Sequence, residues 1–342
     1  MRQMKNLLPL VGIACSLAGC GQSGKHATVQ TDSCEIVNPV ITTRYSADPS
    51  ARVFNDTLYI YPSHDRDEAE WFDMEDYYVY STTDMVHYKE EGLIFEPLKQ
   101  TKWAKSMMWA PDCVAKNGKY YFYFPTDQDH IGVAVGDSPK GPFKDALGKP
   151  LISRNSPGVS APRDFIDPCV FTDDDGTSYL LVGQNALNIV RLNEDMISYD
   201  DKPVVLDNVK ELPYFFEAIW MHKYKGKYYL SYSTGANYQK TAPQLGYAMA
   251  DHITGPYQFK GFILGPVSSG TNHHSIVEYK GRWWLFYHTA ARYLSTVPED
   301  SINWGHATFR RSVCAAPLYY NEDGTIRQVE VKDTYKIPCL EK

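Results

Sequence analysis

Five hairpin-like segments recur along the chain, and this repeat restricts its fold more than any other feature. Each segment enters a polar turn and leaves it on a strand rich in aromatic residues, as in VAKNGKYYFYFP and EYKGRWWLFYHT. The turns recur every 50 to 62 residues, at Asn55-Asp56, Asn117-Gly118, Asp175-Gly176, Lys225-Gly226 and Lys280-Gly281. A short turn of Asn, Asp or Gly between two apolar runs is a strong local signal for a β-hairpin.

A repeat of this length predicts an all-β fold, a five-bladed β-propeller in which each hairpin belongs to one blade. The stretches YYVYSTTDMVHYKEEG, IGVAVGDSPKGPF and LGYAMADHITGPYQF fit the outer strands of the blades. An open solenoid of hairpins is the alternative, but the chain lacks distinct polar capping repeats, which favours closure into a ring. We predict one propeller domain over residues 34–342, with no second domain.

The N-terminus has the pattern of an export signal. Arg2 and Lys5 precede the apolar stretch LLPLVGIAC, which is too short to span a bilayer, and LAGC follows at residues 17–20. LAGC resembles the cleavage site of bacterial lipoproteins, and an ordinary secretory signal cut nearby is the alternative. We predict a signal peptide over 1–19, a flexible tether over 20–33 and a lipid on Cys20. The lipoprotein would then lie in the periplasm, in the outer membrane or on the cell surface of a bacterium.

The seven cysteines reduce to five once Cys15 leaves with the signal and Cys20 carries lipid. Cys34 and Cys339 lie at opposite ends of the folded region, and a disulfide between them would join the termini in an oxidising compartment. The remaining three lie in strand-like runs and are expected to be small buried residues: Cys113, Cys169 and Cys314. No cysteine spacing indicates a zinc site.

The composition favours sugars over nucleic acids as partners. Aromatic residues make up 14% of the chain, including 26 Tyr and 7 Trp, and a groove lined with them suits stacking on sugars or bases. Binding to nucleic acid requires a clustered basic surface. The formal net charge is −7, and no run of Lys and Arg supplies such a surface.

Acidic residues stand at matching positions of the repeat. Counting back eight or nine residues from the Gly or Asp of each turn leads to the start of the first strand of each hairpin. These blade-head positions hold Asp48, Ala110, Asp167, Glu217 and His273. Equivalent positions on the inner strands of a propeller meet at one mouth of the central channel. The sequence therefore predicts three carboxyl groups and an imidazole in one small space.

Three interpretations of this cluster are open: solvated strand ends, a metal site, or an acid and a base around a substrate. Acids on separate repeats with aromatic neighbours fit the last of these best. Glu217 lies in the apolar segment YFFEAIW, where desolvation raises a carboxyl pKa, so we expect it to be the general acid. Asp48, in the more polar YSADPSAR, is expected to be the general base. Asp167 is expected to keep the proton on Glu217 by like-charge repulsion.

The chain resembles glycoside hydrolase family 43, five-bladed propellers that cleave arabinose- and xylose-containing glycans. The resemblance rests on ADPS, WAPD, IDP, FEAIWMHKYKGKYYLSYS and NHHSIVEYKGRWWLFYH, and it covers nearly the whole folded chain. It implies the same three roles: Asp48 as general base, Asp167 as pKa modulator and Glu217 as general acid. It also implies inversion of the anomeric configuration, with a water molecule held between Asp48 and the sugar.

The resemblance further implies residues around the sugar. A histidine near the centre of the channel, beside a calcium ion or a water molecule, is expected at His273, while His274 faces the wall because adjacent strand residues point in opposite directions. No cofactor is required, and calcium in the channel is optional. An arginine that approaches the sugar hydroxyls is expected at Arg311 rather than Arg310. Candidates for the apolar wall of the pocket, or equally for the core, are Trp109 and Phe216.

An α-L-arabinofuranosidase acting on arabinoxylan or arabinan is the function we expect from this resemblance. We expect the chain to end with the propeller, without the β-sandwich that many β-xylosidases of the family use to close their pocket. An exo-β-1,4-xylosidase or a galactan-active enzyme on the same scaffold is the first alternative, and a sugar-binding lipoprotein without catalysis is the second. The expected partner is an arabinose- or xylose-containing oligo- or polysaccharide, and the chain is expected to act as a monomer.

Overall fold

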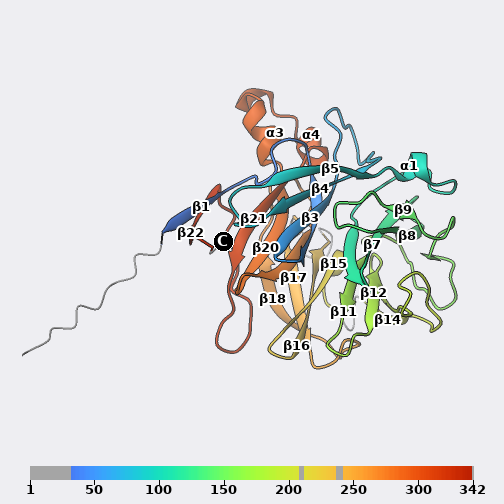
Figure 1. Ribbon diagram of the computed structural model, residues 1–342. Helices are drawn as coiled ribbons and strands as arrows, with labels where there is room; N and C mark the ends of the chain where they lie inside the picture. Colours follow the sequence, from blue (N-terminus) through green and yellow to red (C-terminus); the bar gives the residue numbers. More distant parts are fainter. Residues whose placement is uncertain (1–31, 208–211, 236–241, 341–342) are drawn as a thin grey trace, which may run out of the picture. The chain divides into compact units, whose positions relative to one another are not determined.

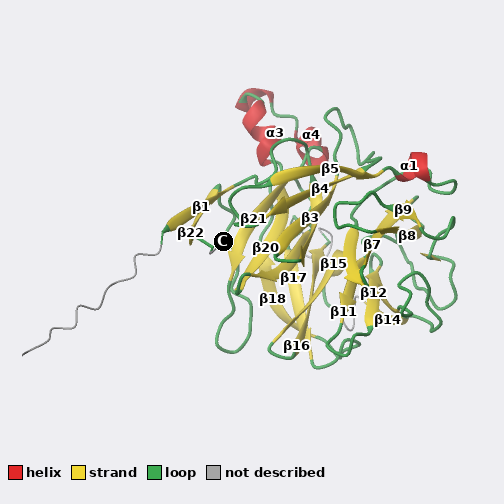
Figure 2. Ribbon diagram, viewed as in Figure 1, coloured by secondary structure: helices red, strands yellow, loops and turns green. Residues whose placement is uncertain are grey.

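The computed structural model describes residues 32–207, 212–235 and 242–340, and these residues form five antiparallel β-sheets arranged in a ring (Figure 1). Strands dominate this part of the chain, and its helices are short (Figure 2). The prediction of an all-β, five-bladed β-propeller is confirmed. Blades one to five consist of β2–β5, β6–β10, β11–β14, β15–β18 and β19–β21.

The strands, in chain order, are β1 (Ser33–Val37), β2 (Ala47–Phe54), β3 (Thr57–Ser63), β4 (Tyr77–Thr82), β5 (Lys89–Phe95), β6 (Asp112–Lys116), β7 (Lys119–Thr126), β8 (His130–Gly136), β9 (Lys144–Asp145), β10 (Ile152–Ser153), β11 (Cys169–Thr172), β12 (Ser178–Val182), β13 (Ala186–Arg191), β14 (Val204–Asp207), β15 (Phe215–Tyr224), β16 (Lys227–Thr234), β17 (Leu245–Ala250), β18 (Gln258–Leu264), β19 (His274–Tyr279), β20 (Arg282–Thr289), β21 (Ser312–Leu318) and β22 (Thr334–Pro338). The helical segments are α1 (Pro97–Gln100), α3 (Ala291–Thr296), a 3₁₀ turn (Glu299–Ser301) and α4 (Trp304–Phe309).

The predicted turns join the first two strands of every blade. Both central residues have positive φ at Asn55-Asp56, Asn117-Gly118, Lys225-Gly226 and Lys280-Gly281. Two positive φ angles are typical of type I′ turns, whose twist matches that of the strands on either side. The predicted outer strands also form, as β4, β8 and β17.

The hydrophobic core lies between neighbouring blades. One cluster joins Leu58 and Ile60 of blade one to Trp284 of blade five. The backbone N–H of Ala51 in blade one donates to Ser275 Oγ of blade five at 3.0 Å. Because the last blade packs on the first, the ring is closed, which excludes an open solenoid.

The two ends of the described chain meet outside the blades. Strands β1 and β22 pair antiparallel, and the predicted disulfide between Cys34 and Cys339 is present, with the two Cα atoms 4.9 Å apart. The other cysteines of the described chain are free and buried, as predicted: Cys113, Cys169 and Cys314. The predicted signal peptide and Cys20 lie outside the described residues and stay predictions. None of the helices in residues 32–207, 212–235 and 242–340 is long and apolar enough to cross a membrane.

Asp112, the acid of the WAPD motif, joins three blades inside the channel. Its carboxylate accepts hydrogen bonds from Ser50 Oγ at 2.6 Å, Arg52 Nε at 2.9 Å and the Val170 N–H at 2.6 Å. The Arg52 guanidinium also lies over the Trp220 ring of blade four, 4.2 Å from its centroid. A buried ion pair with this many partners fixes the blades relative to one another. The network lies between a pocket at one mouth and a second, of about 450 Å³, at the turn-bearing mouth.

Candidate active site

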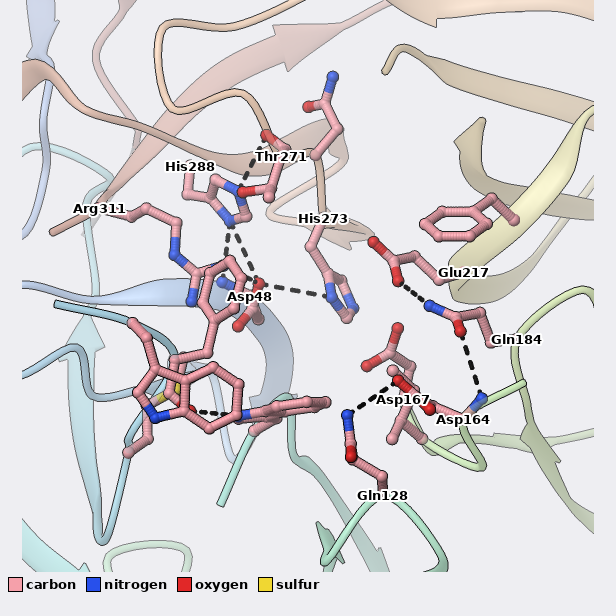
Figure 3. Close-up of a pocket in the computed structure, with 17 residues that line it drawn as sticks. Asp48, Gln128, Asp164, Asp167, Gln184, Glu217, Thr271, His273, His288 and Arg311 are labelled. Carbon is pink, nitrogen blue, oxygen red and sulfur yellow. Dashed lines mark hydrogen bonds and ion pairs between the residues drawn. The ribbon is translucent and has the colours of Figure 1, made fainter. Parts of the chain in front are cut away.

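A pocket of about 350 Å³ at the blade-head mouth collects the side chains that the sequence singles out (Figure 3). The residues predicted for the site that line it are Asp48, Trp109, Asp167, Phe216, Glu217, His273 and Arg311. Four of the five blade-head residues therefore meet in one place. In blade two, Ala110 is buried and its neighbour Trp109 lines the pocket instead. Figure 3 shows Asp48 and Glu217 on opposite sides, with His273 and Asp167 between them.

Local backbone distortions aim the acids into this pocket. Asp48 has φ 49°, and together with Pro49 it opposes a single residue of β3, which makes a β-bulge. Asp167 has φ 60°, and Ala218, directly after Glu217, has φ 59° at an irregularity in the register of β15. Such left-handed residues cost roughly 1–3 kcal/mol each and gather at functional sites. Bulges beside active sites redirect side chains. The distortions at Asp48, Asp167 and Ala218 turn the three acids toward the same pocket.

Asp48 is held in its ionised form. Its side chain is buried; Oδ1 accepts a hydrogen bond from Arg311 Nη1 at 2.9 Å, and Ser63 Oγ donates to Oδ2. Burial by itself raises the pKa of Asp48, but Arg311, the neighbouring histidines and Ser63 outweigh it and lower the pKa to about 2. Asp65 fixes Arg311 by accepting from its backbone N–H, Nε and Nη2 at 2.8 to 2.9 Å. Asp48 is therefore an anion at neutral pH, as a general base must be.

The two histidines beside Asp48 are uncharged at neutral pH. Burial lowers the pKa of His273 to about 4 and that of His288 to about 3. The Asp48 N–H donates to His288 Nδ1 at 3.1 Å, so Nδ1 is the acceptor and the proton sits on Nε2, 3.0 Å from Thr271 Oγ1. His273 Nδ1 lies 3.6 Å from Asp48 Oδ1. Arg311 is therefore the cation that stabilises the Asp48 charge at neutral pH.

Glu217 lies in surroundings that favour its protonated form. Burial raises the pKa of Glu217 to about 7, and the charges of Asp48 and Asp164 act in the same direction. Gln184 Nε2 opposes this shift by donating to Glu217 Oε2 at 2.6 Å. The Asp164 N–H donates to Gln184 Oε1 at 3.3 Å, which fixes the orientation of the amide. Glu217 is thus a carboxyl group that still holds its proton near neutral pH.

Asp167 is linked to Glu217 through the backbone. It is 5% exposed, and its Oδ2 accepts a hydrogen bond from the N–H of Ala218 at 2.8 Å. Burial and the nearby Glu217 charge raise the pKa of Asp167 well above its usual range. Two carboxyl groups coupled in this way titrate as a pair. The pair therefore retains a proton at a pH where separate carboxyl groups have lost theirs.

Aromatic side chains form the other walls of the pocket. Trp109 Nε1 donates to the Phe72 carbonyl at 2.8 Å, and the Trp109 ring meets the Trp71 ring edge-on at 6.2 Å. Phe216 also lines the pocket, and the Arg163 guanidinium lies 5.4 Å from the centroid of its ring. From the sequence, Trp109 and Phe216 could each belong to the pocket wall or to the core. In the structure both line the pocket.

The structure separates the two pairs of adjacent candidates. His274 is fully buried and its Nε2 lies 2.6 Å from Ser231 Oγ, so it is a wall residue, while His273 lines the pocket. Arg310 is not among the pocket-lining residues, and Arg311 is. Arg311 was expected to approach the sugar hydroxyls, but the contacts that hold its guanidinium are those to the two acids described above.

The sequence patterns did not reveal Asp65, Gln128 and Gln184. Each lies two residues beyond the end of the second strand of its blade, after β3, β7 and β12. Because that strand runs antiparallel to the first, it ends at the mouth where the first strand begins. Counting eight to ten residues forward from the turns would have found all three. The same geometry brings His288, near the end of β20, beside Asp48.

The side chains around His273 do not supply the set of oxygen ligands that calcium prefers. Ca²⁺ binds through several oxygen ligands, whereas His273 offers a nitrogen and the Asp48 carboxylate beside it is already bound by Arg311. No group of three or more His, Cys, Asp or Glu side chains within the described ranges is arranged to hold a metal ion. We therefore assign no catalytic step to calcium.

The opposed pKa shifts of Asp48 and Glu217 across one pocket are those that the base and the acid of a glycoside hydrolase require, and this is the class of enzyme that the site indicates. The chain belongs to family 43 of these enzymes: the model of the glycosyl hydrolases family 43 matches residues 36–326. It is accordingly a glycosidase.

Known relatives are named after two activities, on xylosides and on arabinosides. The chain is 38% identical over 339 residues to a xylosidase/arabinosidase of Bacteroides ovatus, covering 84% of this chain and 96% of that protein. It is 37% identical over 341 residues to a beta-xylosidase of Xylanibacter ruminicola, covering 85% of this chain and 98% of that protein. The solved structure of an alpha-L-arabinofuranosidase from Clostridium thermocellum is 37% identical and matches with a TM-score of 0.71, covering 89% of this chain and 98% of that one.

Proposed function

We propose that this glycosidase removes terminal α-L-arabinofuranosyl units from arabinoxylan or arabinan, with inversion of the anomeric configuration. The observation that carries the proposal is the pair of carboxyl groups with opposite pKa shifts on opposite sides of the pocket. Inverting hydrolysis needs one carboxylic acid and one carboxylate on opposite faces of the sugar. Glu217 and Asp48 fit these two requirements.

The reaction mechanism follows from the protonation states of these two carboxyl groups. Glu217 donates its proton to the glycosidic oxygen as the bond from that oxygen to the anomeric carbon breaks. A water molecule attacks the anomeric carbon from the other face, and Asp48 accepts a proton from it. Arg311 and Ser63 occupy one acceptor position on each Asp48 oxygen, which leaves lone pairs for this water. Trp109 and Phe216 exclude bulk water from the sugar.

Terminal β-D-xylosyl units are the second candidate substrate, and the relatives favour it as strongly. The beta-xylosidase of Xylanibacter ruminicola is matched over 98% of its length. A protein of that name is therefore matched almost completely by this propeller chain, so a β-sandwich is no guide to whether this chain acts on xylosides or arabinosides. The xylosidase/arabinosidase of Bacteroides ovatus carries both activities in its name.

Hydrolysis of nitrophenyl α-L-arabinofuranoside and nitrophenyl β-D-xylopyranoside tests the proposal. We expect release from the arabinofuranoside, and ¹H NMR of the first-formed anomer should show inversion. Release from the xyloside alone would replace the arabinofuranosidase proposal with the xylosidase one. Hydrolysis of neither pentoside, with sugar binding retained, would favour a binding protein. Glu217→Gln, prepared in parallel, shows whether any activity comes from a contaminating enzyme.

We also propose that the protein is an exported lipoprotein held by a lipid on Cys20. Arg2, Lys5 and the LAGC motif support this, and the Cys34–Cys339 disulfide suits an oxidising compartment. Expression in a bacterial host with labelled palmitate should label the wild type but not Cys20→Ser. Equal labelling of the two proteins, or none, would contradict lipidation at Cys20.

A further inference from the structure

Two exposed tryptophans lie at the rim of the pocket. Trp71 is 44% exposed and lines the pocket, and Trp304, the first residue of α4, is 62% exposed. In the part of the chain that the structure describes, these are the tryptophans that rank as exposed. Large apolar side chains that gather on an exposed surface often mark a binding site.

Helix α4 packs on the loop that carries Trp71. His306 Nε2 lies 3.2 Å from Glu70 Oε1, and the Phe309 ring packs edge-on against Phe72 with 4.8 Å between centroids. Glu70 and Phe72 are the two neighbours of Trp71, and Phe72 lines the pocket. In Figure 1, α4 stands at the same end of the molecule as the segment between β3 and β4. The helix is therefore fixed at the rim on the Trp71 side.

A second set of contacts places α4 against another part of the rim. Gly270 lies so close to Thr308 of α4 that a Cβ atom at Gly270 would be 3.6 Å from Thr308 Oγ1. The residue after Gly270 is Thr271, which lines the pocket. In α3, Arg292 Nη1 lies 3.9 Å from Asp67 Oδ1 in the Trp71 loop. Trp304 thus projects from a helix held between two pocket-lining segments, outside the pocket itself.

We propose that Trp71 and Trp304 bind the sugar units of a polysaccharide main chain that extends from the unit held in the pocket. This rests on the proposed function and specifies its substrate as polymeric arabinoxylan. The aromatic surface continues from the pocket to Trp71, whose ring lies 6.2 Å from Trp109 and 6.5 Å from Phe72. Trp304 stands beside it on helix α4, whose Phe309 packs against Phe72. An indole offers a flat apolar face to the C–H face of a sugar ring and a polar N–H at its edge.

The variant Trp304→Ala, in the full chain, tests this surface. The measurement is kcat/KM on wheat arabinoxylan divided by kcat/KM on nitrophenyl α-L-arabinofuranoside, which carries no sugar beyond the cleaved unit. We expect this ratio to fall about fivefold, equivalent to roughly 1 kcal/mol of lost stacking. Trp304→Phe should recover part of the loss. Tyr319→Ala is the matched control, because Tyr319 is 57% exposed after β21 and lines a different surface depression.

An unchanged ratio in Trp304→Ala, or an equal fall in Tyr319→Ala, would overturn the proposal. If the wild type hydrolyses neither pentoside, the proposed function fails but the surface remains testable by binding. Wheat arabinoxylan cast into a native gel should then retard the wild type more than Trp304→Ala. Equal retardation of the two proteins would overturn the polysaccharide surface on its own.

Discussion

The two sides of the pocket carry the same functional group in opposite protonation states. On the base side, Asp48 meets the Arg311 guanidinium and the Ser63 hydroxyl, and its pKa falls to about 2. On the acid side, Glu217 follows the aromatic Phe216 and accepts a hydrogen bond from the uncharged Gln184 amide, and its pKa rises to about 7. The side chains are both carboxyl groups, so the difference comes from their partners.

This comparison shows where the chemistry of the site is decided. Asp48 is buried and Glu217 is partly buried, and desolvation raises the pKa of each. The base side supplies a buried cation, Arg311, from the residue just before β21, more than 260 residues away in the chain. The histidines beside Asp48 add no charge at neutral pH because burial keeps them neutral. The protonation states of the two carboxyl groups are therefore set by long-range contacts between blades.

The largest expected effect comes from removing either carboxyl group. Asp48→Asn and Glu217→Gln should each lower kcat about 10²–10⁴-fold, the range typical of a lost general base or acid. The two losses should differ in their dependence on the leaving group. Glu217→Gln should recover much of its rate on a dinitrophenyl glycoside, whose leaving oxygen needs no proton, while Asp48→Asn should not. Equal recovery in both variants would contradict the assignment of acid and base.

Asp167→Asn should have a smaller effect, about 10–100-fold in kcat/KM, together with a shift in pH dependence. Because the two acids titrate as a pair, a neutral Asn at position 167 removes the repulsion between their ionised forms, so the pKa of Glu217 should fall. The basic limb of the kcat/KM profile, where Glu217 loses its proton, should move to lower pH. Asp174→Asn, at the other mouth of the channel, is the matched control. A basic limb that stays in place would count against the modulator role of Asp167.

Some residues of this site can be predicted from the sequence, and others cannot. The blade-head positions follow from the turn spacing because every blade repeats one hairpin, so Asp48, Asp167 and Glu217 can be grouped from the sequence alone. The left-handed backbone at Asp48 and Asp167 could not be predicted, since aspartate does not require a positive φ. Nor could the Asp65–Arg311 pair, because it joins the segment after the second strand of blade one to the start of the last strand of blade five.

Thermal stability should separate the two sides in a way that activity cannot. The pKa of Asp48 lies below its ordinary value of 3.8, so its charge stabilises the fold above pH ~4 and this contribution is lost as the pH falls toward 2. The pKa of Glu217 lies above its ordinary value of 4.5, so its protonated form stabilises the fold and this is lost as the pH rises through 7. Asp48→Asn should therefore lower Tm at pH 8, whereas Glu217→Gln should raise it.

Each of these stability changes is on the order of 2–3 kcal/mol, since one pKa unit corresponds to about 1.4 kcal/mol. Differential scanning calorimetry at pH 5 and pH 8 gives the comparison. At pH 5 Glu217 is protonated in the wild type, so the gain from Glu217→Gln should disappear. Tm changes of the same sign in both variants at pH 8 would show that the two sides do not differ in the way their pKa values indicate.

The smallest expected effect tests a single hydrogen bond on the acid side. Gln184 donates to Glu217 Oε2 at 2.6 Å, and a donated hydrogen bond favours the ionised carboxylate. Gln184→Met keeps the length of the side chain but removes the donor, so the pKa of Glu217 should rise and the basic limb of kcat/KM should move up by less than about one pH unit. Gln128→Met is the matched control, because Gln128 lines the same pocket but donates to Asp164 at 3.1 Å. A basic limb that moves down in Gln184→Met, or moves as far in Gln128→Met, would show that this amide does not set the proton affinity of Glu217.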